Sequence, residues 1–241
     1  MSDKWGKSGV NPVRTNYHPD GTTITTTSDG TLSASGAVAA ITFALMQEDE
    51  QIRTIALKNP KYANSFPMEV GNQWGGFYFG PFLAVTLYAT GSLANSNQTK
   101  KLGFEIAQGI LYSEAISFVS KGIIGRSRPF TNQGASDYNP FTFFDSPHNS
   151  FPAGHVDAAI ALSTVLSKNA GSGFLKVIAY IPAALTVTSR IMQDEHWASD
   201  VFIGAAIGYF VGTWVVKIHE NKVPRIQVTS VYPLGLKINL N

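Results

Sequence analysis

The chain of 241 residues contains no cysteine, and only 14% of its residues are charged. The lack of cysteine excludes disulfide bonds, thiolate catalysis and cysteine-based zinc sites. The low charge, set against a hydrophobic content of 44%, argues against global disorder and allows a sizeable core. The formal net charge is only +2 and no block of lysine and arginine occurs, so we expect no nucleic-acid partner.

The N-terminal residues Met1–Trp5 include no apolar segment, so we expect no signal peptide in this chain. Two charge-free apolar stretches, 77–94 and 201–216, are noticeable, but the second is short and glycine, proline and hydroxyl residues interrupt the first. A membrane-spanning helix needs about 20 predominantly apolar residues. We therefore favour a soluble helical domain with peripheral membrane contact over an integral membrane protein. We expect a periplasmic or cell-envelope location, which is compatible with prior removal of a signal peptide. No feature of the sequence indicates the oligomeric state.

Three regions of different character follow one another along the chain. Residues 1–30 form a polar arm with one short strand at 22–27, and residues 222–241 alternate apolar and polar positions, which predicts a β-like tail with a hairpin. Between them, residues 31–221 repeat apolar side chains at helical spacing. The expected fold class is all-α, with short β trim at both ends. The expected helices cover 32–47, 49–58, 79–94, 101–121, 155–168, 174–192 and 198–220.

Three short polar segments stand out in this apolar region: Lys121–Pro129, Phe151–His155 and Ser189–Asp200. Together they supply three fixed cations, two histidines and one carboxylate. Phosphoryl transfer needs such a set, because cations bind the phosphate oxygens, a nucleophile attacks phosphorus, an acid protonates the leaving oxygen and a carboxylate orients an imidazole.

The spacing within the third segment supports this interpretation. His196 and Asp200 are four positions apart, so on one helix their side chains can meet. A carboxylate on one ring nitrogen fixes the tautomer and leaves the other nitrogen free to attack. Alone, the segment is equally compatible with an incidental pair at a solvated helix start, and Lys121 with a helix-end cation. The combination of the three segments favours the phosphate site.

Taken together, the segments resemble the signature of the type 2 phosphatidic acid phosphatase superfamily, which includes class A bacterial acid phosphatases, lipid phosphate phosphatases and vanadium haloperoxidases. The family pattern is Lys-x6-Arg-Pro, then Pro-Ser-Gly-His, then Ser-Arg-x5-His-x3-Asp. The matching residues, in the same order, are Lys121…Pro129, Pro152…His155 and Ser189…Asp200. The resemblance covers residues from about 75 to 218 and implies a bundle of about six to eight helices of the phosphatidic acid phosphatase/haloperoxidase type.

The resemblance also implies a role for each matching position. His196 would be the nucleophile that forms a phosphohistidine, Asp200 would orient it, and His155 would protonate the leaving oxygen. The residues implied to hold the phosphate are Lys121, Arg128, Arg190, Gly154 and Ala153. No metal or other cofactor is implied, because the three cations neutralise the phosphate, and vanadate is expected as an inhibitor.

One position, Ala153, departs from the family pattern, which usually has serine there. The missing hydroxyl removes one hydrogen bond to a charged group, worth about 1.5–3 kcal/mol. A natural variant, an engineered change and a partly degenerate enzyme are all consistent with this alanine. Because every charged and titrating position is intact, degeneracy is the least favoured of the three.

The sequence therefore predicts a metal-independent phosphatase that hydrolyses a phosphate monoester or a lipid (pyro)phosphate. The alternatives are an enzyme like the vanadium-dependent haloperoxidases, with vanadate as cofactor, and a partly degenerate phosphate-binding protein. Haloperoxidases of this superfamily are generally much larger, and the chain has no separate halide-site motif. The leaving group is not identified: we expect the pocket mouth at 74–79 and 130–149, whose aromatic residues either grip the substrate or serve ordinary packing.

Overall fold

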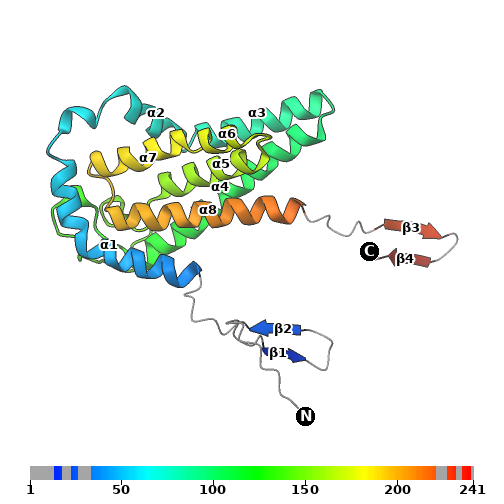
Figure 1. Ribbon diagram of the computed structural model, residues 1–241, viewed down its shortest axis with the longest axis horizontal. Helices are drawn as coiled ribbons and strands as arrows, with labels where there is room; N and C mark the ends of the chain where they lie inside the picture. The colour runs from blue at the N-terminus through cyan, green and yellow to red at the C-terminus, as the bar shows by residue number, and fades with distance from the viewer. Residues whose placement is uncertain (1–13, 18–22, 27–33, 221–226, 232–234, 240–241) are drawn as a thin grey trace, which may run out of the picture. The chain divides into compact units, whose positions relative to one another are not determined.

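The computed structural model describes residues 14–17, 23–26, 34–220, 227–231 and 235–239. Eight α-helices lie within these residues (Figure 1), which confirms the predicted helical bundle. Three short 3-10 helices, η1 (Pro60–Tyr62), η2 (Pro129–Thr131) and η3 (Ser146–His148), lie in the connections. The α-helices are α1 (Ala34–Ala56), α2 (Phe66–Trp74), α3 (Phe79–Leu93), α4 (Asn97–Ile124), α5 (Gly154–Asn169), α6 (Gly173–Ile178), α7 (Ile181–Met192) and α8 (Ala198–Glu220).

Two antiparallel hairpins account for the β structure. Strand β1 (Arg14–Tyr17) pairs with β2 (Thr23–Thr26), and β3 (Gln227–Val231) pairs with β4 (Gly235–Asn239). In the C-terminal hairpin the two strands pair with each other, as one of the two expected arrangements has it. By internal contacts the chain divides into two units, Met1–Ala39 and Ala40–Asn241. The domain boundaries predicted after residues 30 and 221 lie outside the described residues and stay predictions.

The helices differ from the sequence-based expectation in two places near the N-terminus. Helix α1 is continuous, although two helices were expected over 32–47 and 49–58, because no glycine or proline lies where these ranges meet. Helix α2 was not expected because its nine residues are too short for a clear periodicity. It begins after Ser65, and a proline lies in its first turn, as is common at helix starts.

Two other helix ends have local causes. Helix α4 begins four residues earlier than expected because Ser96 caps it, its Oγ accepting a hydrogen bond from the Thr99 N–H at 3.3 Å. The single helix expected over 174–192 is divided into α6 and α7, and Pro182 lies in the first turn of α7.

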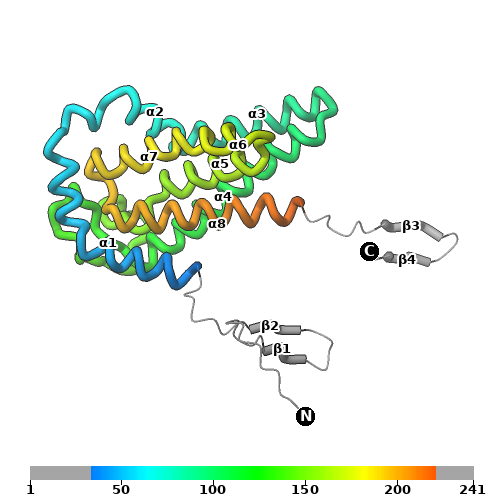
Figure 2. The backbone as a smooth tube through the Cα atoms, in the orientation of Figure 1, coloured from blue at the N-terminus to red at the C-terminus, as the bar shows by residue number. Residues whose placement is uncertain are grey.

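Helix α5 occupies the centre of the bundle, where it packs against α4, α7 and α8 (Figure 2). Its Leu162 and Val165 are fully buried and share one core cluster with Ala84 of α3, Ile106 of α4 and Val216 of α8. Helix α8 approaches α5 closely through glycine. A Cβ atom on Gly208 would lie 2.3 Å from the Asp157 carbonyl oxygen, so only glycine fits.

The ends of four helices meet at one end of the bundle. Helix α4 ends at Gly125, which has a left-handed φ of 60° and donates its N–H to the Lys121 carbonyl at 2.8 Å. The chain therefore turns sharply into the segment that carries Arg126 and Arg128. The start of α5, the end of α7 and the start of α8 lie beside this turn (Figure 1). All three polar segments singled out in the sequence lie here.

Candidate active site

Lys121, Arg128, Arg190, His155 and His196 form one electrostatic cluster, although four helix ends supply them. The pKa of His196 is lowered by the nearby Arg128, Lys121 and His155. The pKa of His155 is lowered by Arg190, Lys121 and Arg128. The structure thus brings together the three cations and both histidines that the sequence singled out.

His196 lies in the turn between α7 and α8 and is 3% exposed. Its Nδ1 lies 2.7 Å from the carbonyl oxygen of Ser150. A carbonyl oxygen only accepts hydrogen bonds, so Nδ1 carries the proton and Nε2 keeps its lone pair. Burial, followed by the nearby Arg128 and Lys121, lowers the pKa of His196 well below its ordinary value. The ring is therefore neutral at ordinary pH and has a nucleophilic nitrogen.

Asp200 reaches this imidazole through Ser150 rather than directly. Its Oδ2 accepts a hydrogen bond from the Ser150 hydroxyl at 2.5 Å and another from the Trp197 N–H at 3.1 Å. The expectation of direct contact assumed that both residues lie on one helix, but α8 begins at Ala198, after His196. Helical spacing therefore does not apply to the pair, and the Ser150 carbonyl is the group that contacts the ring.

Arg126 is a site residue that the sequence analysis did not single out. It is 1% exposed, and its Nη1 donates to Asp200 Oδ1 at 2.5 Å and to Ser199 Oγ at 2.7 Å. Its Nε and Nη2 donate to the Ala135 carbonyl at 2.9 and 2.7 Å. The only sequence signal was a second arginine in Gly-Arg-Ser-Arg-Pro, just before Arg128.

Asp49 of α1 completes this buried network. Its Oδ2 accepts from Arg126 Nη2 at 2.8 Å and from Ser199 Oγ at 2.6 Å, and its Oδ1 accepts from the Ser199 N–H at 3.0 Å. Helix α1 is thereby tied to the first turn of α8. Nothing in the sequence marks Asp49, because its partners lie 77 and 150 positions away.

Arg128 and Arg190 have neighbours that fix their guanidinium groups. Arg128 donates from Nε to the Ser146 carbonyl at 3.0 Å and pairs through Nη1 with Glu195. Arg190 is 8% exposed, and its Nη2 donates to Asn72 and, at 2.6 Å, to Gln193. Its buried Nε has no hydrogen-bond partner among the described residues. A buried donor without an acceptor is costly, and a bound anion would supply the acceptor.

Lys121, Gly154 and His155 lie close together at the start of α5. A Cβ atom on Gly154 would lie 3.1 Å from Lys121 Nζ. Burial and the charge of Arg128 lower the pKa of Lys121. Part of His155 is exposed to solvent. Burial of its ring, followed by the charges of Arg190, Lys121 and Arg128, nevertheless lowers its pKa to about 4. Backbone N–H groups at a helix start have no partner within the helix and favour anions.

Ala153 is fully buried and packs with Val156 and Val201. It is the N-cap residue of α5, and no side chain caps that helix. Its N–H donates to the Asp200 carbonyl at 3.1 Å, so this N–H already has an acceptor. The phosphate contact predicted for residue 153 stays a prediction, as do the roles predicted for the other site residues.

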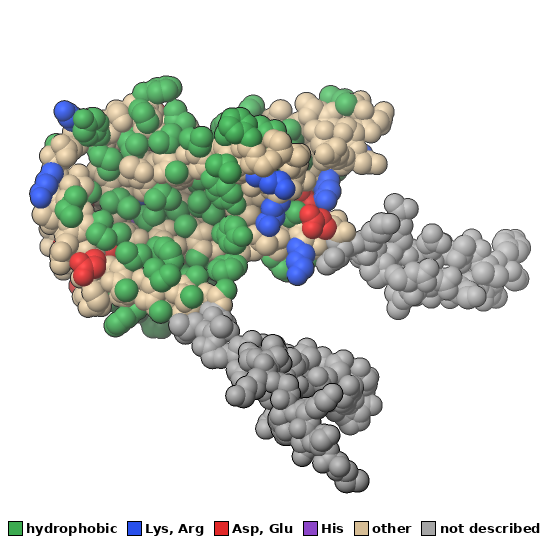
Figure 3. Space-filling view, viewed as in Figure 1, with side chains coloured by type: hydrophobic (Ala, Val, Ile, Leu, Met, Phe, Trp, Pro, Cys, Tyr) green, Lys and Arg blue, Asp and Glu red, His purple; other side chains and the backbone are tan. Residues whose placement is uncertain are grey.

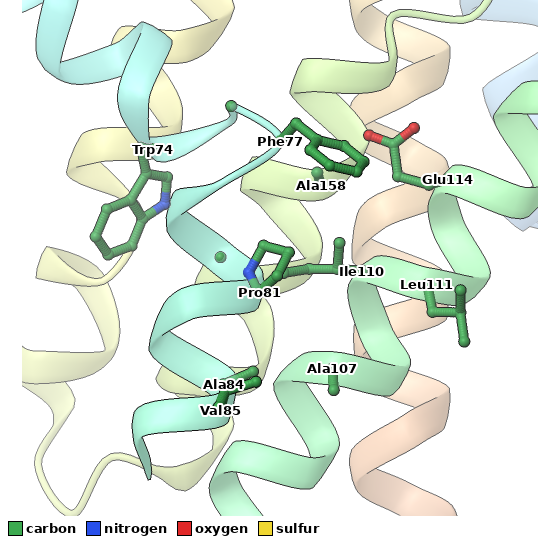
Figure 4. A pocket seen from close by; sticks show the side chains of 12 residues that line it. Trp74, Phe77, Pro81, Ala84, Val85, Ala107, Ile110, Leu111, Glu114 and Ala158 are labelled. Carbon is green, nitrogen blue, oxygen red and sulfur yellow. The ribbon is translucent and has the colours of Figure 1, made fainter. Parts of the chain in front are cut away.

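A cavity of about 340 Å³ lies beside this cluster, between α3, α4 and α5 (Figure 4). Trp74 and Phe77, two aromatic residues of the predicted pocket mouth, line it. The 130–149 loop does not: its Phe143 and Phe144 pack on Phe118 instead. The cavity adjoins the site, because a Cβ atom on Gly75, next to Trp74, would lie 2.3 Å from the His155 carbonyl oxygen. Within residues 34–220, no group of three or more histidine and carboxylate residues is placed to hold a metal ion.

Comparison with known proteins identifies the class that this fold and site define. Residues 103–224 match the family model of the PAP2 superfamily, and the chain belongs to that superfamily. The match includes the three polar segments but not α1, α2 or α3. The resemblance inferred from the sequence is thereby confirmed.

Individual relatives match shorter parts of the chain. A lipid A 1-phosphatase of Porphyromonas gingivalis is 44% identical over 66 residues, which are 27% of this chain and 15% of that protein. A decaprenylphosphoryl-5-phosphoribose phosphatase of Mycobacterium tuberculosis is 32% identical over 108 residues, 44% of this chain and 55% of that protein. The chain thus spans about half or less of the length of these relatives. The crystal structure of Aquifex aeolicus LpxE has a similar fold, with a TM-score of 0.53 and 22% identity over 70% of this chain and 94% of that one.

Proposed function

We propose that this protein is a phosphatase that hydrolyses a lipid phosphate monoester through a phosphohistidine on His196, without a metal ion. The observation that carries the proposal is the state of His196. Its Nδ1 is held by the Ser150 carbonyl at 2.7 Å, its pKa is lowered, and Lys121 and Arg128 lie close enough to shift that pKa. A neutral, oriented imidazole beside fixed cations is suited to attack a phosphorus atom.

The chemistry proceeds in two balanced steps. In the first, Nε2 of His196 attacks phosphorus, the bond to the leaving oxygen breaks, and protonated His155 gives its proton to that oxygen. In the second, neutral His155 takes a proton from water, the water oxygen attacks phosphorus, and the phosphorus–nitrogen bond breaks to release inorganic phosphate. The nucleophilic ring becomes positively charged in the first step, and the Ser150 carbonyl and the nearby Asp200 carboxylate stabilise that charge.

Three cations hold the phosphate oxygens in this proposal. Arg190 offers the buried Nε that has no partner within the described residues. Lys121 lies in the last turn of α4 and Arg128 in the segment that follows it. The first N–H groups of α5 add partial positive charge. Fixed charges in a partly buried site stabilise the charge that develops on the phosphoryl oxygens.

The cavity supports a lipid as the leaving group. It adjoins His155, the proposed acid, and almost all of its lining is apolar. The two curated relatives are named for phosphatase action on lipid A and on a decaprenyl-linked sugar phosphate, which agrees with a substrate of this class.

The surface of the helices supports contact with a lipid bilayer. Figure 3 shows hydrophobic side chains spread over one face of the helical region. Two segments, 173–192 and 198–220, are long and apolar enough to cross a membrane, and only 22% and 33% of their apolar windows are buried. The threonine hydroxyls of α3 have hydrogen-bond partners within the helix, because Thr86 and Thr90 donate to carbonyl groups one turn earlier at 2.8 Å.

The preference for a soluble domain rested partly on these polar residues of α3. Since their hydroxyls are hydrogen-bonded within the helix, they are a weaker argument against contact with lipid. That the site faces the periplasm stays a prediction, which fusions to topology reporters would test.

The test uses the full chain in detergent with farnesyl monophosphate as substrate. We expect release of inorganic phosphate that EDTA does not reduce, competitive inhibition by orthovanadate, and trapping of labelled phosphohistidine after an alkaline quench. His196→Ala should abolish both turnover and label, whereas His219→Ala, which removes a histidine beside Glu105 in the last turn of α8, should retain both.

Other outcomes would support the alternatives. Loss of activity on chelation, restored by a divalent cation, contradicts the proposed mechanism. Bromination by the vanadate-loaded protein would favour the haloperoxidase alternative, and phosphate binding without turnover would favour a binding protein.

A further inference from the structure

Glu114 of α4 is the only charged side chain that lines the cavity beside the site. The other lining residues are apolar or glycine (Figure 4). Its neighbours along the cavity wall are Ile110, Leu111 and Ala158. A single carboxylate in an apolar wall is costly to bury, so its presence calls for a functional reason.

Glu114 stands at the junction of the cavity and the phosphate-binding residues. A Cβ atom on Gly154 would lie 3.2 Å from Glu114 Oε2 and 3.1 Å from Lys121 Nζ. Both charged groups therefore face the first residue of α5, immediately before His155. Figure 4 shows the carboxylate at the end of the cavity near Phe77 and Ala158.

Asp157, in the first turn of α5, is a second buried carboxylate near Glu114. Asp157 is fully buried, Ser117 donates to its Oδ2, and its Oδ1 has no hydrogen-bond partner within residues 34–220. Burial and then the charge of Glu114 raise the pKa of Asp157 well above its ordinary value. Burial also raises the pKa of Glu114, but Lys121 opposes that change. Glu114, which Lys121 favours in its charged form, is therefore the carboxylate of the pair that ionises first.

In an in-line transfer the leaving oxygen lies opposite the attacking nitrogen of His196. His155, the proposed acid, follows Gly154, which Glu114 faces. The His155 carbonyl lies beside Gly75, next to the cavity. We therefore infer that the group beyond the leaving oxygen enters the cavity past Glu114. In a lipid monophosphate that group begins with neutral carbon. In a lipid diphosphate it begins with a second phosphoryl group, whose negative charge would face the Glu114 carboxylate.

We propose that Glu114 is a specificity-determining residue that makes the site favour lipid monophosphates over lipid diphosphates. The mechanism is repulsion between its half-buried carboxylate and an anionic leaving group, which water screens less there than in bulk solvent. This inference rests on the proposed phosphatase function, of which it specifies the substrate class.

The experiment compares farnesyl monophosphate with farnesyl diphosphate, which have the same hydrocarbon chain. The measured quantity is the ratio of kcat/KM for the monophosphate to kcat/KM for the diphosphate, in the full chain. We expect Glu114→Gln to lower this ratio by about tenfold, because the effect on the shared phosphoryl group cancels in the ratio and only the diphosphate has a second phosphoryl group that the charge repels. Glu48→Gln, which removes an exposed carboxylate from α1, should leave the ratio unchanged.

A ratio that stays the same in active Glu114→Gln overturns the inference. If that variant does not fold, Glu114→Asp provides the test, because it draws the charge back from the junction and should lower the ratio by a smaller factor. An unchanged ratio in Glu114→Asp would then overturn the proposal. A wild-type protein that hydrolyses neither substrate refutes the proposed function itself, which is a different result.

Discussion

Arg126 and Asp200 form a fully buried ion pair, with 2.5 Å between Nη1 and Oδ1. The second side of the same guanidinium binds Asp49 at 2.8 Å. One arginine therefore compensates two buried carboxylates and connects α1 to the start of α8. Because Asp49 lies outside residues 103–224, the site depends on a helix that the family match does not include.

Removing Arg126 should destabilise the protein strongly. Arg126→Ala leaves two carboxylates buried without their cation, and we expect a loss of about 3–5 kcal/mol in the free energy of unfolding. The matched control is Arg53→Ala, which breaks the partly exposed Arg53–Asp194 pair and should cost only about 1 kcal/mol. Denaturant unfolding of both variants measures the difference, and equal losses would contradict the importance given to the buried network.

The connection through Ser150 predicts a graded effect on catalysis. Ser150→Ala keeps the backbone carbonyl that binds His196 but removes the hydroxyl that joins Asp200 to it. We expect kcat to fall by roughly tenfold. Asp200→Asn removes the charge that stabilises the imidazolium and should lower kcat by roughly a hundredfold or more. Steady-state kinetics measures kcat for both variants. A lower kcat for Ser150→Ala than for Asp200→Asn would contradict the larger role given to the Asp200 charge.

His155 should take up a proton when an anion binds. Burial and three cations lower the pKa of His155 to about 4, so without a bound anion the ring is neutral at pH 6. Bound phosphate neutralises those cations, so the pKa rises and the ring becomes the acid that the mechanism needs. Calorimetry of vanadate binding at pH 6, in two buffers of different ionisation enthalpy, should show proton uptake that His155→Ala lacks. Identical proton uptake in the two proteins contradicts this role.

The same lowered pKa predicts how stability depends on pH. The unfolded chain binds a proton at this histidine with an ordinary pKa of 6.5, whereas the native protein binds it only near pH 4. Above pH 6.5 the two states bind equally few protons, so there is no contribution. As the pH falls from 6.5 to 4, the unfolded state gains protons first and the free energy of unfolding decreases. Denaturant unfolding across this range should show a smaller decrease for His155→Gln than for the wild type.

Ala153→Ser tests the one departure from the family pattern. A hydroxyl at this N-cap position can accept a hydrogen bond from the first turn of α5 and donate one to a phosphate oxygen. We expect a gain of about 0.5–2 kcal/mol in stability and a rise of roughly tenfold in kcat/KM and in vanadate affinity. A gain in stability alone would place residue 153 outside the phosphate site. A loss in both would show that the packing against Val156 leaves no room for the oxygen.

The sequence predicted the bundle and the three polar segments for a physical reason. Charged residues and histidines are rare in apolar helices, so Lys121, Arg190 and His196 were conspicuous in their surroundings. Arg126 was not, because its role depends on Asp49, a partner 77 positions away on a helix with no distinctive pattern. The expected direct contact between His196 and Asp200 assumed that one helix contains both residues. Helix α8 begins at Ala198, so it includes Asp200 but not His196.

The close contact of α8 with α5 limits how this protein could be made more heat-resistant. Replacing a helical glycine with alanine ordinarily stabilises a helix by about 1 kcal/mol, and α8 has Gly204, Gly208 and Gly212 on the face toward α5. A methyl group on Gly204 would lie 2.7 Å from the Ala153 carbonyl oxygen, so it would separate the two helices at the point where they carry Asp200 and His155. The three glycines set the distance between α8, which carries Asp200, and α5, which carries His155. Engineers seeking thermal tolerance would therefore have to work on the other faces of α8.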